Sequence, residues 1–154
     1  MIAILFDNKL QKCYNNNVQL YCIVINERSS MIQHFQSNKN DIKKVLKELK
    51  GIINDEDFDY KTQIVLDKRK NDLELGVYSN QNTMLLLDYN IEDIARELSL
   101  LTRDDYYETI IDVVGSELLL YVFKKKIKGY LIYIKFSIRR NKIIFLISFH
   151  VSKE

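Results

Sequence analysis

Residues 118–150 restrict the fold more than any other part of the sequence, because they read as three successive β-strands. The strand-like runs are 118–123, 130–139 and 142–150, all rich in β-branched and aromatic residues and separated by short polar breaks. Breaks this short join antiparallel neighbours, whereas parallel strands need a long crossover. The sequence therefore predicts a three-stranded antiparallel meander.

The middle run, residues 130–139, alternates between two kinds of side chain. Successive side chains of a strand point to opposite faces of the sheet. One face carries Tyr130, Ile132, Ile134, Phe136 and Ile138, and the other carries Leu131, Tyr133, Lys135, Ser137 and Arg139. The first face is predicted to pack on a core. The second face presents a phenol, an ammonium, a hydroxyl and a guanidinium.

The position of His150 relative to Tyr133 and Lys135 depends on the length of the loop between the last two strands. An even loop centred on residues 140–141 predicts three cross-strand pairs: Tyr133 with Ser148, Lys135 with Leu146, and Leu131 with His150. His150 then lies diagonal to Tyr133 on the same face. An odd loop would turn the third strand over and separate His150 from Tyr133 and Lys135.

Upstream of the meander, the sequence predicts strands first and then helices. Residues 2–6 and 18–26 read as strands. Residues 40–53, 81–88 and 91–101 read as helices, and the first and last show apolar positions at helical spacing. The polar stretch between the early strands and the first helix is expected to be a loop. This order predicts an α+β fold in a single domain, residues 1–154.

Charge is divided unevenly along the chain, although the net charge is only +2. Residues 88–117 contain nine acidic and two basic residues, whereas residues 118–154 contain nine basic residues and one acidic residue. An acidic helical part is therefore predicted to adjoin a basic sheet.

The remaining composition excludes several classes of protein. Two cysteines make neither a disulfide framework nor a metal site of the usual spacing. The apolar start at residues 1–6 is too short for a signal peptide, and no apolar run approaches the roughly 20 residues that span a bilayer. We expect a cytoplasmic protein with no contact with the membrane.

Five blocks in the second half follow one another in a characteristic order over about 70 residues. They are Asn82-Thr-Met-Leu-Leu-Leu-Asp-Tyr89; Ile94, Glu97, Leu98, Leu101, Thr102 and Asp105-Tyr-Tyr107; Val122-Phe-Lys-Lys-Lys-Ile127 with Gly129; Ile132-Tyr-Ile-Lys135; and Ile147-Ser-Phe-His150. In this order and spacing they resemble the MqsR family of toxin ribonucleases, in the form common among low-GC bacteria. Residues 56–154 would then be a toxin-like core, and residues 1–55 an extension of strands and a helix.

The resemblance implies a RelE-like architecture and a metal-independent endoribonuclease that cleaves mRNA without a cofactor and is neutralised by a cognate antitoxin. By position, the Tyr and Lys of the family's central strand correspond to Tyr133 and Lys135, and the basic residue ending the last strand corresponds to His150. Two features depart from the family. Glu108 stands where better-studied members have Lys, and a Gln of the first meander strand has no clear counterpart.

The chemistry of these residues suits RNA cleavage without a metal. Attack of a 2′-hydroxyl on the adjacent phosphate needs a base, an acid for the departing 5′-oxygen and a cation for the developing charge. His150 titrates near neutrality, Lys135 can neutralise phosphate charge, and Tyr133 can donate a hydrogen bond or stack on a base. Phosphate contacts are predicted from the hairpin tip, Arg139, Arg140 and Lys142, and from the preceding turn, Lys124, Lys126 and Lys128. His34, the other histidine, falls in the polar loop and has no predicted role.

Two other functions remain open. One is a non-catalytic binding or inhibitor protein on the same fold, such as a phage- or plasmid-encoded regulator, which Glu108 and the missing Gln favour. The other is an RNA-binding protein without catalysis, whose salt-dependent binding would survive the substitution His150→Ala.

Overall fold

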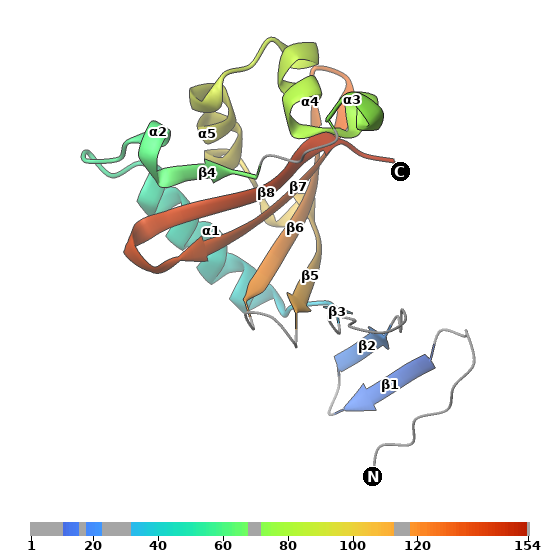
Figure 1. Ribbon diagram of the computed structural model, residues 1–154. Helices are drawn as coiled ribbons and strands as arrows, with labels where there is room; N and C mark the ends of the chain where they lie inside the picture. The colour runs from blue at the N-terminus through green and yellow to red at the C-terminus, as the bar shows by residue number, and fades with distance from the viewer. Residues whose placement is uncertain (1–10, 16–17, 23–31, 68–71, 113–117, 154) are drawn as a thin grey trace.

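The computed structural model describes residues 11–15, 18–22, 32–67, 72–112 and 118–153, and it shows an α+β fold. The strands described form one sheet of eight in the order β1-β2-β3-β5-β6-β7-β8-β4 (Figure 1). They are β1 Gln11–Asn15, β2 Val18–Cys22, β3 Ile32–Phe35, β4 Ile64–Leu66, β5 Tyr106–Asp112, β6 Leu119–Ile127, β7 Tyr130–Arg139 and β8 Ile143–Val151. The sheet is mixed, because β4 runs parallel to β8 while the other pairs are antiparallel.

The helices lie mainly between β3 and β5 in the chain. They are α1 Lys39–Ile53, α2 Tyr60–Gln63, α3 Asp72–Leu75, α4 Asn80–Leu87 and α5 Ile91–Ser99, with 3-10 turns η1 Gly76–Tyr78, η2 Arg103–Asp105 and η3 Arg140–Lys142. The three predicted helices are confirmed to within two residues at each end. Asn90 begins α5 with a capping box, in which its side chain and that of Asp93 satisfy each other's backbone N–H groups.

One face of the sheet shares a hydrophobic core with the helices, and α1 and α5 lie together behind it (Figure 1). The apolar stripe of α1 supplies Ile42, Val45, Leu46, Leu49 and Ile52, α5 supplies Ile94, Ala95 and Leu98, and the meander supplies Phe123, Ile132, Ile134, Phe136, Ile144, Leu146 and Phe149. The rings of Phe123 and Phe136 stack at 5.6 Å at its centre. The alternation of β7 therefore places its side chains on the two faces as predicted. We call the opposite face, which carries Tyr133 and Lys135 and does not pack on this core, the open face.

Strands β6, β7 and β8 pair antiparallel in sequence order, but the predicted register of β8 is wrong. Tyr133 lies opposite His150, and Lys135 lies opposite Ser148. The loop is odd rather than even, because Arg139 pairs with Ile143 and three residues form the turn.

A β-bulge in β8 reverses the effect of the odd loop. The register shifts between Lys135 and Phe136, so that Ile147 is an extra residue without a partner on β7. From Ser148 onward the side chains have changed face, and His150 lies on the same side as Lys135. His150 therefore lies on the same face as Tyr133 and Lys135, as predicted, but through a different register.

Three other predictions are corrected by the structure. Residues 32–35 form β3, which pairs with β5, where the sequence predicted a loop. Residues 106–112 form β5, where the sequence predicted no strand, and β6 runs through the lysine segment to Ile127. The predicted strand at 2–6 lies outside the described residues, and that at 18–26 is described only as β2. No helix in the described part of the chain is long and apolar enough to cross a membrane.

Candidate functional site

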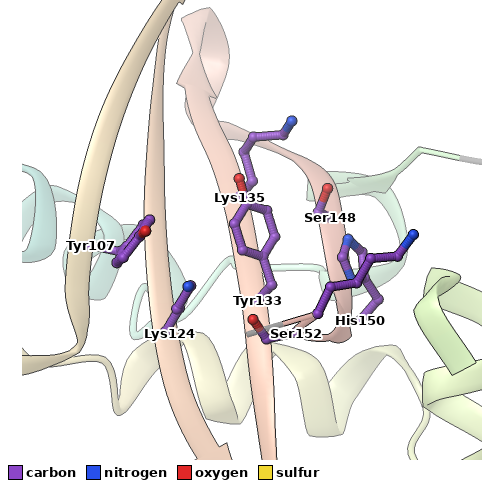
Figure 2. Close-up of a pocket in the computed structure, with 8 residues that line it drawn as sticks. Tyr107, Lys124, Tyr133, Lys135, Ser148, His150 and Ser152 are labelled. Atoms are coloured by element: carbon purple, nitrogen blue, oxygen red, sulfur yellow. The ribbon is translucent and has the colours of Figure 1, made fainter. Parts of the chain in front are cut away.

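A hollow of about 360 Å³ opens on the face of the sheet away from the core (Figure 2). Its lining residues are Tyr107, Lys124, Tyr133, Lys135, Ser148, His150, Ser152 and Lys153. The structure therefore brings together the three predicted catalytic residues and one of the predicted RNA-binding lysines.

Cross-strand pairing places these residues in two rows. Lys124 of β6 lies opposite Tyr133, and Tyr133 lies opposite His150. In the next row Lys135 lies between Val122 on β6 and Ser148 on β8. Opposed residues of antiparallel strands share a face, with Cβ atoms about 5 Å apart, so both rows stand on the open face.

The His150 ring is held in a defined orientation. It stacks on the Tyr133 ring, with 5.3 Å between centroids and 18° between planes. Its Nδ1 lies 2.9 Å from the carbonyl oxygen of Val151. Because a carbonyl can only accept, Nδ1 is the donor in this hydrogen bond. This arrangement is suited to acid–base work.

The charge of the hollow is positive. Lys124, Lys135 and Lys153 line it, and none of its lining residues is acidic. The ammonium of Lys124 lies 3.8 Å from the centroid of the Tyr107 ring, which holds this lysine near one end of the hollow. Several positive groups in a concave surface favour an anionic ligand.

A buried hydroxyl forms part of the wall. Ser148 is 1% exposed, and its Oγ has no hydrogen-bond partner among the described residues. Ser137, two positions along β7 from Lys135, is also buried, and its Oγ also has no hydrogen-bond partner among the described residues.

The lysine run of β6 was expected to form a turn, and the pleat of the strand instead gives its members different neighbours. Lys124 faces the hollow, and Lys126 is exposed two positions further along that face. Lys125 points to the helix side, where its Nζ lies 2.9 Å from Glu97. Lys128, at the turn itself, donates to the carbonyl of Leu87.

Glu97 is a shared acceptor on the helix side of the sheet. The Tyr89 hydroxyl donates to it at 2.9 Å, and the Lys125 ammonium binds its other oxygen. Burial, followed by the neighbouring Glu97 carboxylate, raises the pKa of Tyr89 above its ordinary value. Lys125 therefore belongs to the packing of α5 on the sheet.

The hairpin-tip residues lie apart from the hollow. Arg139 is six positions from Tyr133, roughly 20 Å along an extended strand. Its guanidinium lies 3.9 Å from the centroid of Phe145, and Lys142 binds Asp55 at the end of α1. Arg140 is exposed at the turn. These residues suit contact with a distant part of a long ligand.

Sequence reasoning missed a His–carboxylate pair beside the hollow. His34 on β3 binds Glu108 on β5 through Nδ1 and Oε2, 2.9 Å apart. The β-branched run that follows Glu108 is a signal for β5. His34 had no such signal, because its partner lies 74 residues away in the chain.

Comparison of the chain with models of known protein families finds no match, and comparison with curated proteins finds none either. In the described part of the chain, no three His, Cys, Asp or Glu side chains gather in a group that could hold a metal ion.

Proposed function

We propose that the protein is an endoribonuclease that cleaves single-stranded RNA without a metal, with the hollow on the open face of the sheet as its active site. The observation that carries this proposal is the oriented imidazole of His150 beside Tyr133 and Lys135. The imidazole and the ammonium in one concave site can supply the base and the cation that cleavage through a 2′-hydroxyl needs, and the phenol can donate a hydrogen bond to the phosphate. The resemblance to MqsR toxins, with their RelE-like architecture, supports the same activity.

In this mechanism the scissile phosphate lies over β7. Neutral Nε2 of His150 takes the proton from the 2′-hydroxyl, whose oxygen attacks phosphorus. The ammonium of Lys135 neutralises charge on the phosphate, and the Tyr133 hydroxyl donates a hydrogen bond to a phosphate oxygen. The bond between phosphorus and the 5′-oxygen breaks, this oxygen takes a proton from water, and the hydroxide that remains takes the proton from Nε2, so that His150 is neutral again. The products are a 2′,3′-cyclic phosphate and a 5′-hydroxyl.

The proposed biological role is that of a toxin acting on cellular mRNA in the cytoplasm. Regulation would come from a cognate antitoxin. An acidic segment of such a protein would complement the lysines of the hollow and exclude RNA from it.

The test compares wild type with His150→Asn on a long single-stranded RNA in the presence of EDTA. The Asn amide can still donate to the Val151 carbonyl but cannot titrate, so we expect a 10²–10⁴-fold loss of rate. The products should end in 2′,3′-cyclic phosphate or 3′-phosphate. Lys47→Gln, on the exposed side of α1, is the control and should cleave at the wild-type rate.

Two outcomes would contradict the proposal in different ways. If folded wild-type protein cleaves no RNA, with or without ribosomes, the protein is not a ribonuclease of this kind. If His150→Asn cleaves as fast as wild type, the activity stands and His150 has no part in it.

A second candidate function is that of a non-catalytic binding or inhibitor protein on the same fold, and one contact favours it. Glu108 occupies the position where the better-studied MqsR toxins have a lysine, and it is engaged by His34. A protein of this kind would cleave no RNA, either as wild type or as His150→Asn, and both would bind its partner protein equally well.

A further inference from the structure

Beside the hollow, the open face carries a second group of side chains that the mechanism does not use. It consists of Tyr107 and Glu108 on β5 and His34 on β3. The register of β5 against β6 shifts between Tyr106 and Glu108, so Tyr107 sits at a bulge. Tyr107 lines the hollow, while Glu108 lies opposite Val122 on the open face. Because of the bulge, the consecutive side chains of Tyr107 and Glu108 both lie on the open face.

The carboxylate of Glu108 is held in place but not fully occupied. His34 Nδ1 donates to its Oε2 at 2.9 Å, and the two side chains are 31% and 19% exposed for His34 and Glu108 respectively. A carboxylate offers about four acceptor sites on its two oxygens, so one bond from His34 leaves capacity for further donors. Val122 separates Glu108 from Lys135 across the sheet. The strand that carries Glu108, β5, lies two strand spacings, or roughly 10 Å, from β7, over which the scissile phosphate is proposed to lie.

The Tyr107 ring is available to a planar ligand. Tyr107 is 47% exposed, and the Lys124 ammonium lies over its ring at 3.8 Å from the centroid, so a stacked base would use the opposite face of the ring. Gln36 donates to the Tyr107 carbonyl at 2.7 Å, which fixes the backbone of the bulge. Exposed aromatic side chains beside a positive groove stack on the bases of single-stranded RNA.

A carboxylate beside lysines is unfavourable for phosphate but favourable for a base that presents donors. Guanine presents two adjacent donors, N1–H and N2–H, on its Watson–Crick edge. Adenine and cytosine each present an amino group next to an acceptor, and uracil presents one N–H between two acceptors. A side chain that only accepts hydrogen bonds therefore discriminates in favour of guanine.

We propose that Tyr107 and Glu108 form a nucleobase-binding subsite that prefers guanine, positioned next to the phosphate-binding hollow. This inference rests on the proposed function in that its ligand is single-stranded RNA. Tyr107 supplies the stacking surface, Glu108 accepts from the guanine edge, and His34 positions the carboxylate.

The test measures binding without cleavage. Four 2′-O-methyl oligouridylates, each with G, A, C or U at the central position, are titrated against the protein by fluorescence anisotropy. Their blocked 2′-oxygens cannot act as nucleophiles. Wild type should bind the G-containing oligonucleotide about tenfold more tightly than the other three.

The decisive variant is Glu108→Gln, whose amide oxygen can still accept from His34. It should bind all four oligonucleotides within about twofold of one another, and it should bind the all-uridine one at least as tightly as wild type does, because a charge that repels phosphate is gone. Glu56→Gln, an exposed residue elsewhere, is the control and should keep the preference. Tyr107→Leu should weaken binding of all four, and Tyr107→Phe should not.

The outcomes separate this inference from the proposed function. Equal binding of the four oligonucleotides by wild type, or a preference that persists in Glu108→Gln, overturns the subsite even if RNA is cleaved. A guanine preference lost in Glu108→Gln, in a protein that cleaves nothing, supports the subsite and overturns the ribonuclease. Absence of binding to all four overturns both. A purely structural role for Glu108 would show as reduced stability with the preference unchanged.

Discussion

Removing the side chain of Asn80 is expected to destabilise the protein. This side chain hydrogen-bonds the edge of β8 beyond the end of β4, where none of the described strands pairs with that edge. Its Oδ1 accepts from the N–H of Phe149 at 2.8 Å. Its Nδ2 donates to the carbonyls of Ile147 and Asp67, at 3.2 and 3.0 Å. β4 ends before the bulge, and the amide of Asn80 continues the hydrogen bonding of its edge.

The magnitude follows from the groups left behind by Asn80→Ala. The Phe149 N–H would be buried without a partner, at a cost of about 1–3 kcal/mol, and the two carbonyls would each lose a bond. We expect a loss of about 3 kcal/mol in the free energy of unfolding, or a melting temperature lower by about 6–12 °C for a chain of this size. β8 cannot escape by losing its bulge, because Phe149, now 0% exposed, would turn to the open face and His150 to the core.

Urea denaturation followed by circular dichroism measures this loss directly. Gln81→Ala is the matched control, because Gln81 is the next residue of the same helix and is exposed. It should change stability by less than about 0.5 kcal/mol. If the two variants unfold at the same urea concentration, Asn80 does not hold the bulge.

Two further predictions concern ion pairs of the sheet. Lys125→Ala should lower the free energy of unfolding by about 1–3 kcal/mol, because Glu97 is left half-buried without its cation, whereas the exposed Lys126→Ala should change it by less than about 0.5 kcal/mol in the same urea assay. Equal effects would contradict the assignment of Lys125 to packing. The hydrogen bond from Lys142 lowers the pKa of Asp55 below its ordinary value of 3.8, so the stabilisation is present above that pH and is lost as pH falls through the lowered pKa. The stability difference between wild type and Lys142→Ala should therefore be constant near neutrality and vanish at strongly acidic pH, and a difference that persists there would refute the pairing.

Alternation over a long strand was enough to predict β7 and the open-face positions of Tyr133 and Lys135. The end of β6 was not predictable in the same way. Three consecutive lysines are typical of a solvated turn, and only the fold shows that Lys125 has a carboxylate partner on α5 while Lys124 has an aromatic one on β5. Both partners are distant in the chain, so no local pattern reveals them.

Four of the eight residues that line the hollow, Lys124, Tyr133, Lys135 and His150, were named as site residues from the sequence, whereas Tyr107, Ser148, Ser152 and Lys153 were not, and neither was the way in which the strands bring them together. His150 reaches Tyr133 through an odd loop corrected by the bulge at Ile147, and the bulge depends on Asn80 in a helix far upstream. The strand propensity of nearby residues does not reveal that a bulge offsets an odd loop. His34 was missed for a related reason, because β3 is a short strand whose pairing depends on β5.

The bulge of β8 has an evolutionary consequence. Whether the imidazole of His150 faces the hollow or the core depends on whether the number of unpaired residues between it and Tyr133 is even or odd. The three-residue turn and the single extra Ile147 together make an even number. A deletion of one residue from either place would invert the end of β8, while simultaneous deletions from both would leave the site intact. Related sequences should therefore lose or gain residues here in pairs, and an alignment that places a lone gap in this hairpin has misplaced its histidine.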